Sequence, residues 1–263
     1  MFIHAIDPVL LRLGPLQIRY YGVLFVIAIL LGYWILRKQA REKEINMEII
    51  EEYLLFLILG IIIGARLFHV IVYQAGYYFA DPVRILYIWR GGLASHGAVL
   101  GAILVTWWFS RKKSIPFYTL ADLIALPIAV GSIFIRIGNF INGEIVGRVT
   151  NVPWAVQFQG YDGFRHPSQL YEAAKNVIVS GIMWRLTLLK NLPPGFLFWS
   201  LLVAHSTLRF LVEFFKDYQT SFEPILGVFT MGQVISLIVV IGAGIMLWKT
   251  WKSGKQGKTI KQE

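Results

Sequence analysis

The chain contains seven apolar runs, and this pattern limits the folds that are open to it. A run of roughly 20 apolar residues has the length that an α-helix needs to cross the hydrocarbon core of a bilayer. The candidate spans are residues 18–36, 52–72, 92–110, 118–140, 169–189, 195–214 and 228–249. The sequence therefore predicts an all-α membrane protein with seven transmembrane helices.

The composition agrees with this class. Hydrophobic residues make up 56% of the chain, charged residues only 15%, and the mean hydropathy is +0.60, well above an average soluble domain. The nine tryptophans and twelve tyrosines suit the interfacial belts of a membrane protein. There is no cysteine, which excludes disulfides, thiolate metal ligands and a cysteine nucleophile. Any thiol chemistry must use a thiol from a partner.

The net charge of +10 is distributed in a way that favours lipid over nucleic acid as the partner. Basic residues are scattered between the apolar runs and gather in a few short loops, such as Arg111 to Lys113. That distribution is typical of contact with anionic headgroups and of topology control. Basic residues are denser in the loops after spans one, three and five and in the tail. The positive-inside rule then places the N-terminus outside and the C-terminus in the cytoplasm.

We expect a single integral membrane domain over residues 1–263, with one insertion on the outer side. The loop at residues 141–167 is predicted to form a small extracytoplasmic head. Within it, alternation of Trp154, Val156 and Phe158 predicts one strand of a hairpin.

Two terminal segments lie outside the spans. The short amphipathic stretch from Pro8 to Leu16 is expected on the membrane surface. The tail at residues 252–263 is polar and lacks apolar periodicity, so we expect it to be disordered. We find no internal repeat, which leaves an inverted-repeat transporter with little support.

The segment RIGNFINGEIVGR, residues 136–148, is unusually polar for the end of an apolar run. An arginine at the centre of a membrane helix costs about 2.5 to 3.5 kcal/mol, so such groups are kept mostly where they face a cavity or a substrate. Arg136 and Asn139 are spaced i,i+3 and share a helical face. Gly138 and Gly143 leave room for a ligand or another helix. The segment is predicted to be a site.

Other polar residues allow two interpretations. Arg209 and Glu213 are spaced i,i+4, so they either neutralise each other as a structural pair or belong to the site. His96 lies in the small-residue stretch GGLASHGAVLG and is either a proton carrier or a hydrogen-bonded core residue. We assign Arg66 and His69 mainly to structure, as interfacial anchors.

This residue set indicates chemistry on a phosphate-bearing lipid. The guanidinium groups of Arg136 and Arg209 match phosphate oxygens, and His96, with a reference pKa of about 6.5, suits a general base. Neither clustered metal ligands, a glycine-rich phosphate loop nor a nucleophile elbow is found in the sequence. We expect group transfer on a lipid without a metal or cofactor.

Five motifs, in order, resemble those of the phosphatidylglycerol:prolipoprotein diacylglyceryl transferase family. They are RYYG at 19–22, GGLASHG at 91–97, RIGNFINGEIVGR at 136–148, RHPSQLYEA at 165–173 and LRFLVEFF at 208–215. The similarity extends through essentially the whole chain. The two longest motifs are each specific, whereas SHG alone is not.

The resemblance implies a multi-pass enzyme of the bacterial plasma (inner) membrane, with its active site toward the outer leaflet. Such an enzyme transfers the diacylglyceryl group of phosphatidylglycerol to the lipobox cysteine thiol of a prolipoprotein. It forms a thioether and releases glycerol phosphate, the first step of lipoprotein maturation. By motif, the resemblance implies catalytic roles for His96, Arg209 and Tyr21. It implies phosphatidylglycerol binding by Arg136, Asn139, Glu144 and Glu213.

Several alternatives stay open at this point. A phospholipid transporter or flippase would use the same arginines without bond chemistry, and another transferase would use a hydroxyl acceptor. The base is His96, a group that His96 orients, or none if the arginines promote the reaction. Some relatives carry a tyrosine where this chain has His205, so the role of that position is open too.

Overall fold

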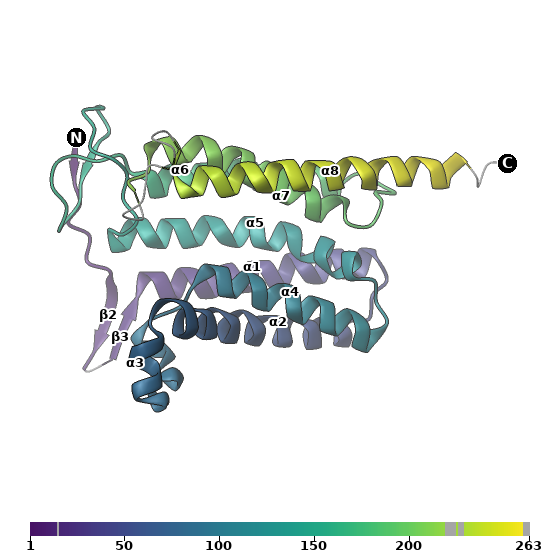
Figure 1. Ribbon diagram of the computed structural model, residues 1–263, viewed down its shortest axis with the longest axis horizontal. Helices are drawn as coiled ribbons and strands as arrows, with labels where there is room; N and C mark the ends of the chain where they lie inside the picture. The colour runs from purple at the N-terminus through teal and green to yellow at the C-terminus, as the bar shows by residue number, and fades with distance from the viewer. Residues whose placement is uncertain (15, 219–224, 226–228, 260–263) are drawn as a thin grey trace. The chain divides into compact units, whose positions relative to one another are not determined.

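The computed structural model describes the chain except for residues 15, 219–224, 226–228 and 260–263. The long elements of the described part are all helices (Figure 1), which confirms the all-α class. It forms two compact units, one from Met1–Leu36 with Asp122–Glu263 and the other from Arg37–Ala121.

Five helices in the described part are long and apolar enough to cross a membrane. They are Tyr20–Glu42 (α1), Met47–Tyr73 (α2, Met47–Phe68, continued by the π-helix His69–Tyr73), Phe117–Asn142 (α5), Phe196–Phe215 (α7, Phe196–Val212, continued by the 3-10 helix Glu213–Phe215) and Met231–Gly254 (within α8, Met231–Thr259). Of the seven predicted spans, the other two also form helices, α4 (Ser95–Lys113) and α6 (Ser168–Thr187), but these are less apolar. Seven spans therefore stay a prediction.

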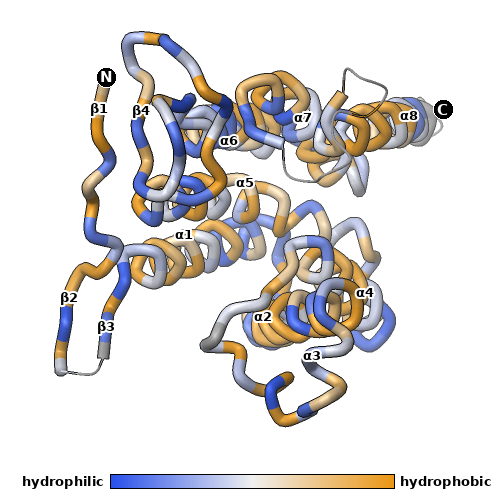
Figure 2. Tube along the Cα trace, turned by 60° about the vertical axis from the view of Figure 1, so that its left-hand side comes forward, coloured by the Kyte–Doolittle hydropathy of each residue, from blue (hydrophilic) through white to orange (hydrophobic). Residues whose placement is uncertain are grey.

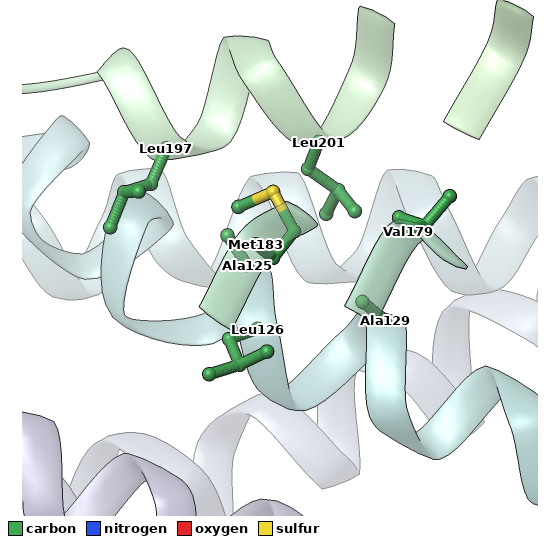
Figure 3. Packing of buried hydrophobic residues seen from close by; sticks show 7 residues of the cluster. All are labelled: Ala125, Leu126, Ala129, Val179, Met183, Leu197 and Leu201. Atoms are coloured by element: carbon green, nitrogen blue, oxygen red, sulfur yellow. The ribbon is translucent and has the colours of Figure 1, made fainter. Parts of the chain in front are cut away.

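Helices α5, α6 and α7 share an apolar core in the first unit (Figure 3). The core consists of Ala125, Leu126 and Ala129 from α5, Val179 and Met183 from α6, and Leu197 and Leu201 from α7. Helix α7 in turn packs along α8. This core fixes the helices that carry the polar motifs.

Asp122 of α5 stabilises the beginning of α7. Its carboxylate accepts hydrogen bonds from the backbone N–H groups of Gly195 and Phe198, both at 2.8 Å. A carboxylate here satisfies unpaired helix donors and complements the positive end of the helix dipole. A side chain from one helix thus caps the next.

The second unit is built on close packing of α2 against α4. Gly60 and Gly64 on α2 face Gly97 and Gly101 on α4, and a Cβ added at Gly64 or Gly101 would overlap a backbone carbonyl oxygen of the other helix. Small residues four apart permit this approach in membrane helices. Between the two helices the chain forms α3 (Ala75–Ala80) and two 3-10 helices, Pro82–Leu86 and Ile88–Arg90.

Short strands form the non-helical part of the first unit. The predicted strand in the head is present as β4 (Val156–Gln157), but its ladder partner is β1 (Phe2–Ile3), in parallel. The antiparallel partner expected for a hairpin is reduced to a single bridge between Val156 and Arg165. A parallel partner about 150 residues away in sequence cannot be predicted from the local sequence pattern.

The two terminal segments, residues 8–16 and 252–263, contain regular secondary structure. Residues Val9–Leu13 (β2) and Leu16–Arg19 (β3) form an antiparallel hairpin, and its position on a membrane surface stays a prediction. Helix α8 runs to Thr259, so it includes most of the tail that we expected to be disordered. Residues 260–263 lie outside the described residues. Hydrophobic residues dominate the long helices, and hydrophilic residues are frequent in the loops (Figure 2).

Candidate active site

The site begins at the C-terminal end of α5, where the motif NFINGE folds into a Schellman cap. Gly143 has a φ of 67°, the left-handed conformation that favours glycine. The N–H of Glu144 donates to the carbonyl of Asn139 at 3.1 Å, and that of Gly143 donates to Phe140 at 3.0 Å. This reversal of the chain brings Glu144 back beside Asn139.

The cap places the side chains of the motif in one hydrogen-bonded chain. Arg136 Nη1 donates to Asn139 Oδ1 at 3.3 Å, and Asn139 Nδ2 donates to Glu144 Oε1 at 2.8 Å. Asn142 Nδ2 donates to the same carboxylate oxygen at 3.2 Å. Because Asn139 is 5% exposed and held at both ends, the chain orients the Arg136 guanidinium. The structure thus brings together three of the predicted site residues.

Glu172 on α6 is the centre of a second network that the sequence reading did not single out. Its side chain is 2% exposed. Oε2 lies 2.7 Å from Lys175 Nζ and 3.8 Å from Arg136 Nε, while Oε1 lies 3.3 Å from Arg209 Nη1. One buried carboxylate therefore joins cations from α5, α6 and α7.

Glu213 is the second carboxylate of this network. Its Oε2 lies 3.5 Å from Arg209 Nη2, which confirms the predicted i,i+4 pair, and 3.3 Å from Lys216 Nζ. Gly232 of α8 leaves the space that Glu213 occupies, because an added Cβ there would overlap the carboxylate. Arg209 is thus shared between Glu172 and Glu213.

The two networks leave positive charge at the accessible edge. Among the described residues, Arg136, Lys175, Arg209 and Lys216 are paired with the carboxylates of Glu172 and Glu213, and Arg136 is joined through Asn139 to a third, Glu144. The lysines and glutamates are at most 4% exposed, whereas the arginine side chains are 23% and 27% exposed. Within the described residues, Arg136 Nη2 has no hydrogen-bond acceptor. The arrangement suits a singly charged anion such as a phosphodiester, whose oxygens match the planar fork of a guanidinium group.

The head is attached to the end of α7 next to these groups. Gly147 forms a bridge with Lys216, and Arg148 Nε donates to the Lys216 carbonyl at 2.8 Å. Arg165 Nη1 contacts Asp217 Oδ2 at 2.6 Å. A side chain at Gly147 would overlap the backbone of Phe215, so glycine is required at this crossing. The head thereby fixes the backbone that carries Lys216.

Tyr21 of α1 also lies at this site. Its ring packs against Gly138, where an added Cβ would come within 2.7 Å of Cδ2. The phenol is within electrostatic range of Glu144 and Arg136. The close approach explains the glycine in RIGN and agrees with the prediction that Gly138 leaves room for another helix.

His96 and His205 differ in how they relate to this site. His96 lies on α4 in the other unit, is exposed, and its ring centroid is 5.9 Å from that of Phe68. Its role in the site therefore stays a prediction, and the alternative of a buried core histidine is wrong. His205 is one turn before Arg209 on α7, within electrostatic range of Lys175 and Glu172.

Sequence reasoning missed Glu172, Lys175 and Lys216 as site residues. The i,i+3 spacing of Glu172 and Lys175 inside a predicted span was the available signal, as was the position of Glu172 at the end of RHPSQLYE. Lys216 lies three residues after Glu213, but its burial depends on the head, which spacing does not reveal.

Comparisons with known proteins agree with the motifs. The family model described as prolipoprotein diacylglyceryl transferase matches residues 8–249. A phosphatidylglycerol–prolipoprotein diacylglyceryl transferase from Geobacter sulfurreducens is 38% identical over 88% of this chain and 90% of the relative. Proteins of the same name from Tolumonas auensis and Aeromonas salmonicida are 40% and 35% identical, over 92% and 98% of this chain and 94% and 96% of theirs. The chain, a multi-pass membrane protein by its apolar helices, belongs to the prolipoprotein diacylglyceryl transferase family.

Proposed function

We propose that this protein is a phosphatidylglycerol–prolipoprotein diacylglyceryl transferase. It transfers the diacylglyceryl group of phosphatidylglycerol to the thiol of a prolipoprotein's lipobox cysteine. The observation that carries the proposal, besides family membership, is the pair Arg136 and Arg209 on either side of the buried Glu172 carboxylate. A transporter would need no bond chemistry, and the names of the relatives favour the transferase.

The phosphate of the lipid binds between the two arginines. The buried Glu172 carboxylate contacts the inner side of both guanidinium groups and holds them in place. The exposed edges of the two guanidinium groups bind phosphate oxygens. Asn139 and Glu144 fix Arg136, and Glu213 fixes Arg209. Pre-oriented positive charge stabilises the phosphate monoester as it leaves.

The reaction is a displacement at the C3 carbon of the diacylglyceryl group. The cysteine sulfur forms the new C–S bond, the C–O bond to phosphate breaks, and glycerol phosphate leaves with the electron pair. The thiol proton passes to a base, because a cysteine with a pKa of about 8.5 is only a few per cent thiolate at neutral pH. We assign this proton to His96, and Tyr21 to the positioning of the lipid beside Arg136.

The protein crosses the bacterial inner membrane seven times, with its N-terminus outside. In this arrangement the C-terminal end of α5 and the head lie on the outer side, so the site opens to the outer leaflet, where lipobox peptides emerge. The excess of basic residues in the alternate loops and the adjoining helix ends, including Arg111 to Lys113 in the last turn of α4, supports this orientation.

Transfer by purified protein is the direct test. Reconstituted protein, phosphatidylglycerol and a lipobox peptide are expected to give glycerol phosphate and a thioether-linked diacylglyceryl peptide in equal amounts. A Cys→Ser peptide is the matched control and is expected to give neither. Lipid movement between leaflets without either product would establish the transporter instead, and product from the serine peptide would identify a hydroxyl acceptor.

A further inference from the structure

The second unit contains a cavity that the proposed function does not use. Its volume is about 610 Å³, within the range of about 300–1,000 Å³ typical of small-molecule sites. It lies at the end of the apolar span Met47–Tyr73, beside α3 and the 3-10 helix Pro82–Leu86. The wall includes Arg66, His69, Tyr73, Tyr77, Tyr78 and Arg84.

Arg66 gives this cavity a buried positive charge. The residue is 4% exposed, and it donates hydrogen bonds only to backbone carbonyls, those of Arg84, Ile85, Tyr87, Gly91 and Gly92. Carbonyls satisfy its donors but carry no net charge. Among the described residues, no carboxylate pairs with Arg66. Because a buried charge is costly without a counter-charge, the cavity favours an anion.

Arg84 supplies a second, accessible guanidinium to the same cavity. It is packed over the Tyr77 ring at 4.6 Å and paired with Asp81 at 2.8 Å, with 38% of its side chain exposed. Asp81 neutralises one of the two arginines, so the cavity keeps the charge of Arg66 in excess. The tyrosines and His69 around it add hydrogen-bonding groups to an aromatic wall.

Large apolar side chains close in sequence to the lining residues are exposed. Phe79, Val83, Leu86 and Trp89 are 63%, 55%, 70% and 74% exposed. At the end of a membrane span, aromatic and apolar side chains of this kind insert at the headgroup level of a bilayer. A soluble anion would have no use for this apolar rim, whereas a lipid has both a charged head and acyl chains.

We propose that this cavity binds the headgroup of an anionic phospholipid from the surrounding bilayer, as a site separate from the proposed transfer chemistry. The phosphate lies against Arg84 and in the field of Arg66, and the rim residues contact the acyl region. Bound lipid would anchor α3 and the 3-10 helices to the membrane surface.

The test uses the absence of native cysteine in the full-length protein. Phe79→Cys carries a single environment-sensitive fluorophore on α3, and the protein is placed in phosphatidylcholine nanodiscs with increasing phosphatidylglycerol and no peptide. We expect a saturable change in emission with phosphatidylglycerol. Arg84→Gln is expected to raise the half-saturating fraction at least about fivefold, because it removes a charge-assisted contact.

A matched pair at Gly76 tests the cavity itself. Gly76 lines the cavity, and a Cβ added there meets nothing within 4 Å. Gly76→Ala is therefore expected to titrate like the parent, whereas Gly76→Phe fills the space and is expected to abolish the response. Equal titration of the two variants would overturn the proposal.

Two further arms identify the source of the signal. If inorganic phosphate gives the same saturable change in phosphatidylcholine nanodiscs, the ligand is a soluble anion and not a lipid, and the proposal is overturned. Arg136→Gln is expected to keep the response, which separates this site from the proposed transfer site. Loss of the response in Arg136→Gln would assign the signal to that site. A failed transfer assay would leave the cavity proposal unaffected.

Discussion

Arg209 Nη1 of α7 lies 3.3 Å from Oε1 of Glu172 on α6, a partner 37 residues away in sequence. Sequence spacing pairs Arg209 with Glu213, and that pair is also present. The arginine is therefore held by two carboxylates, and its guanidinium is fixed in direction as well as in place. Whether Arg209 is only part of an ion pair or also a site residue therefore depends on what the exposed edge of its guanidinium group binds.

Substituting Glu172 is expected to affect both folding and transfer. Glu172→Gln removes the charge that joins Arg136, Lys175 and Arg209, and leaves the buried Lys175 without its ion-pair partner. Breaking such a buried pair typically costs about 3–5 kcal/mol. We expect a clear fall in the midpoint of thermal unfolding in detergent, together with loss of transfer.

The double variant Glu172→Gln with Lys175→Gln separates these two effects. Removing the i,i+3 partner is expected to restore part of the thermal stability while transfer stays lost, since Arg136 and Arg209 still lack the carboxylate that joins them. Glu42→Gln, an exposed carboxylate of α1, is the matched control and should change neither. An active Glu172→Gln protein would exclude a positioning role.

Arg136→Lys tests the geometry of phosphate binding. Lysine keeps the charge but lacks the planar fork, so kcat/KM for phosphatidylglycerol is expected to fall at least about tenfold. Arg185→Lys, at the exposed end of α6, controls for the substitution itself. Full activity of Arg136→Lys in membranes with matched protein levels would mean that only the local potential matters.

The pair Arg209 and Glu213 is tested by combining Arg209→Gln with Glu213→Gln. Each single variant leaves a charge without one of its partners, whereas the double variant removes both charges. We expect the double variant to regain thermal stability relative to the worse single variant and to stay inactive. Recovered transfer in the double variant would reduce Arg209 to a structural role.

His96→Asn distinguishes a base from a scaffold. An amide keeps a hydrogen bond but does not accept a proton at neutral pH, so turnover is expected to fall strongly while phosphatidylglycerol binding is kept. His96 is exposed, so the substitution is expected to leave the unfolding temperature unchanged. Near-normal turnover would remove His96 from the chemistry.

The proposed orientation is tested by single cysteines in this cysteine-free chain. Lys112→Cys is expected to react with an impermeant maleimide only after the inner side is opened, and Asp162→Cys in intact spheroplasts. The two positions are assigned to opposite sides, one in the last turn of α4 and one in the head. Labelling at position 112 in intact spheroplasts would show that the orientation is the opposite of the proposed one.

Local pattern was enough to predict much of this molecule. Apolar runs gave the helices, because length and hydropathy are local properties. The polar segment at residues 136–148 was predicted to be a site, and the structure gathers Arg136, Asn139 and Glu144 there. Arg66 was assigned to structure, and its five carbonyl contacts agree.

The remaining features depend on contacts between distant segments. The connection of Glu172 to Arg136 and Arg209 arises only when α5, α6 and α7 pack together, so the sequence neighbours of these three residues do not reveal it. The same holds for β1, whose partner β4 is in the head. Composition also predicted a disordered tail where α8 runs to Thr259, because a polar segment continues a helix that apolar residues have already nucleated.

The parallel pairing of Phe2 with Val156 sets an order for biosynthesis. A ribosome completes the first strand long before the second, and the intervening helices enter the bilayer in between. In the proposed topology the N-terminal strand waits on the outer side of the membrane without a partner until about 150 residues more have been made, as expected for contacts of large sequence separation. The head then closes in one late step, so a nascent chain halted after α5 should leave its first residues open to protease and the finished protein should not.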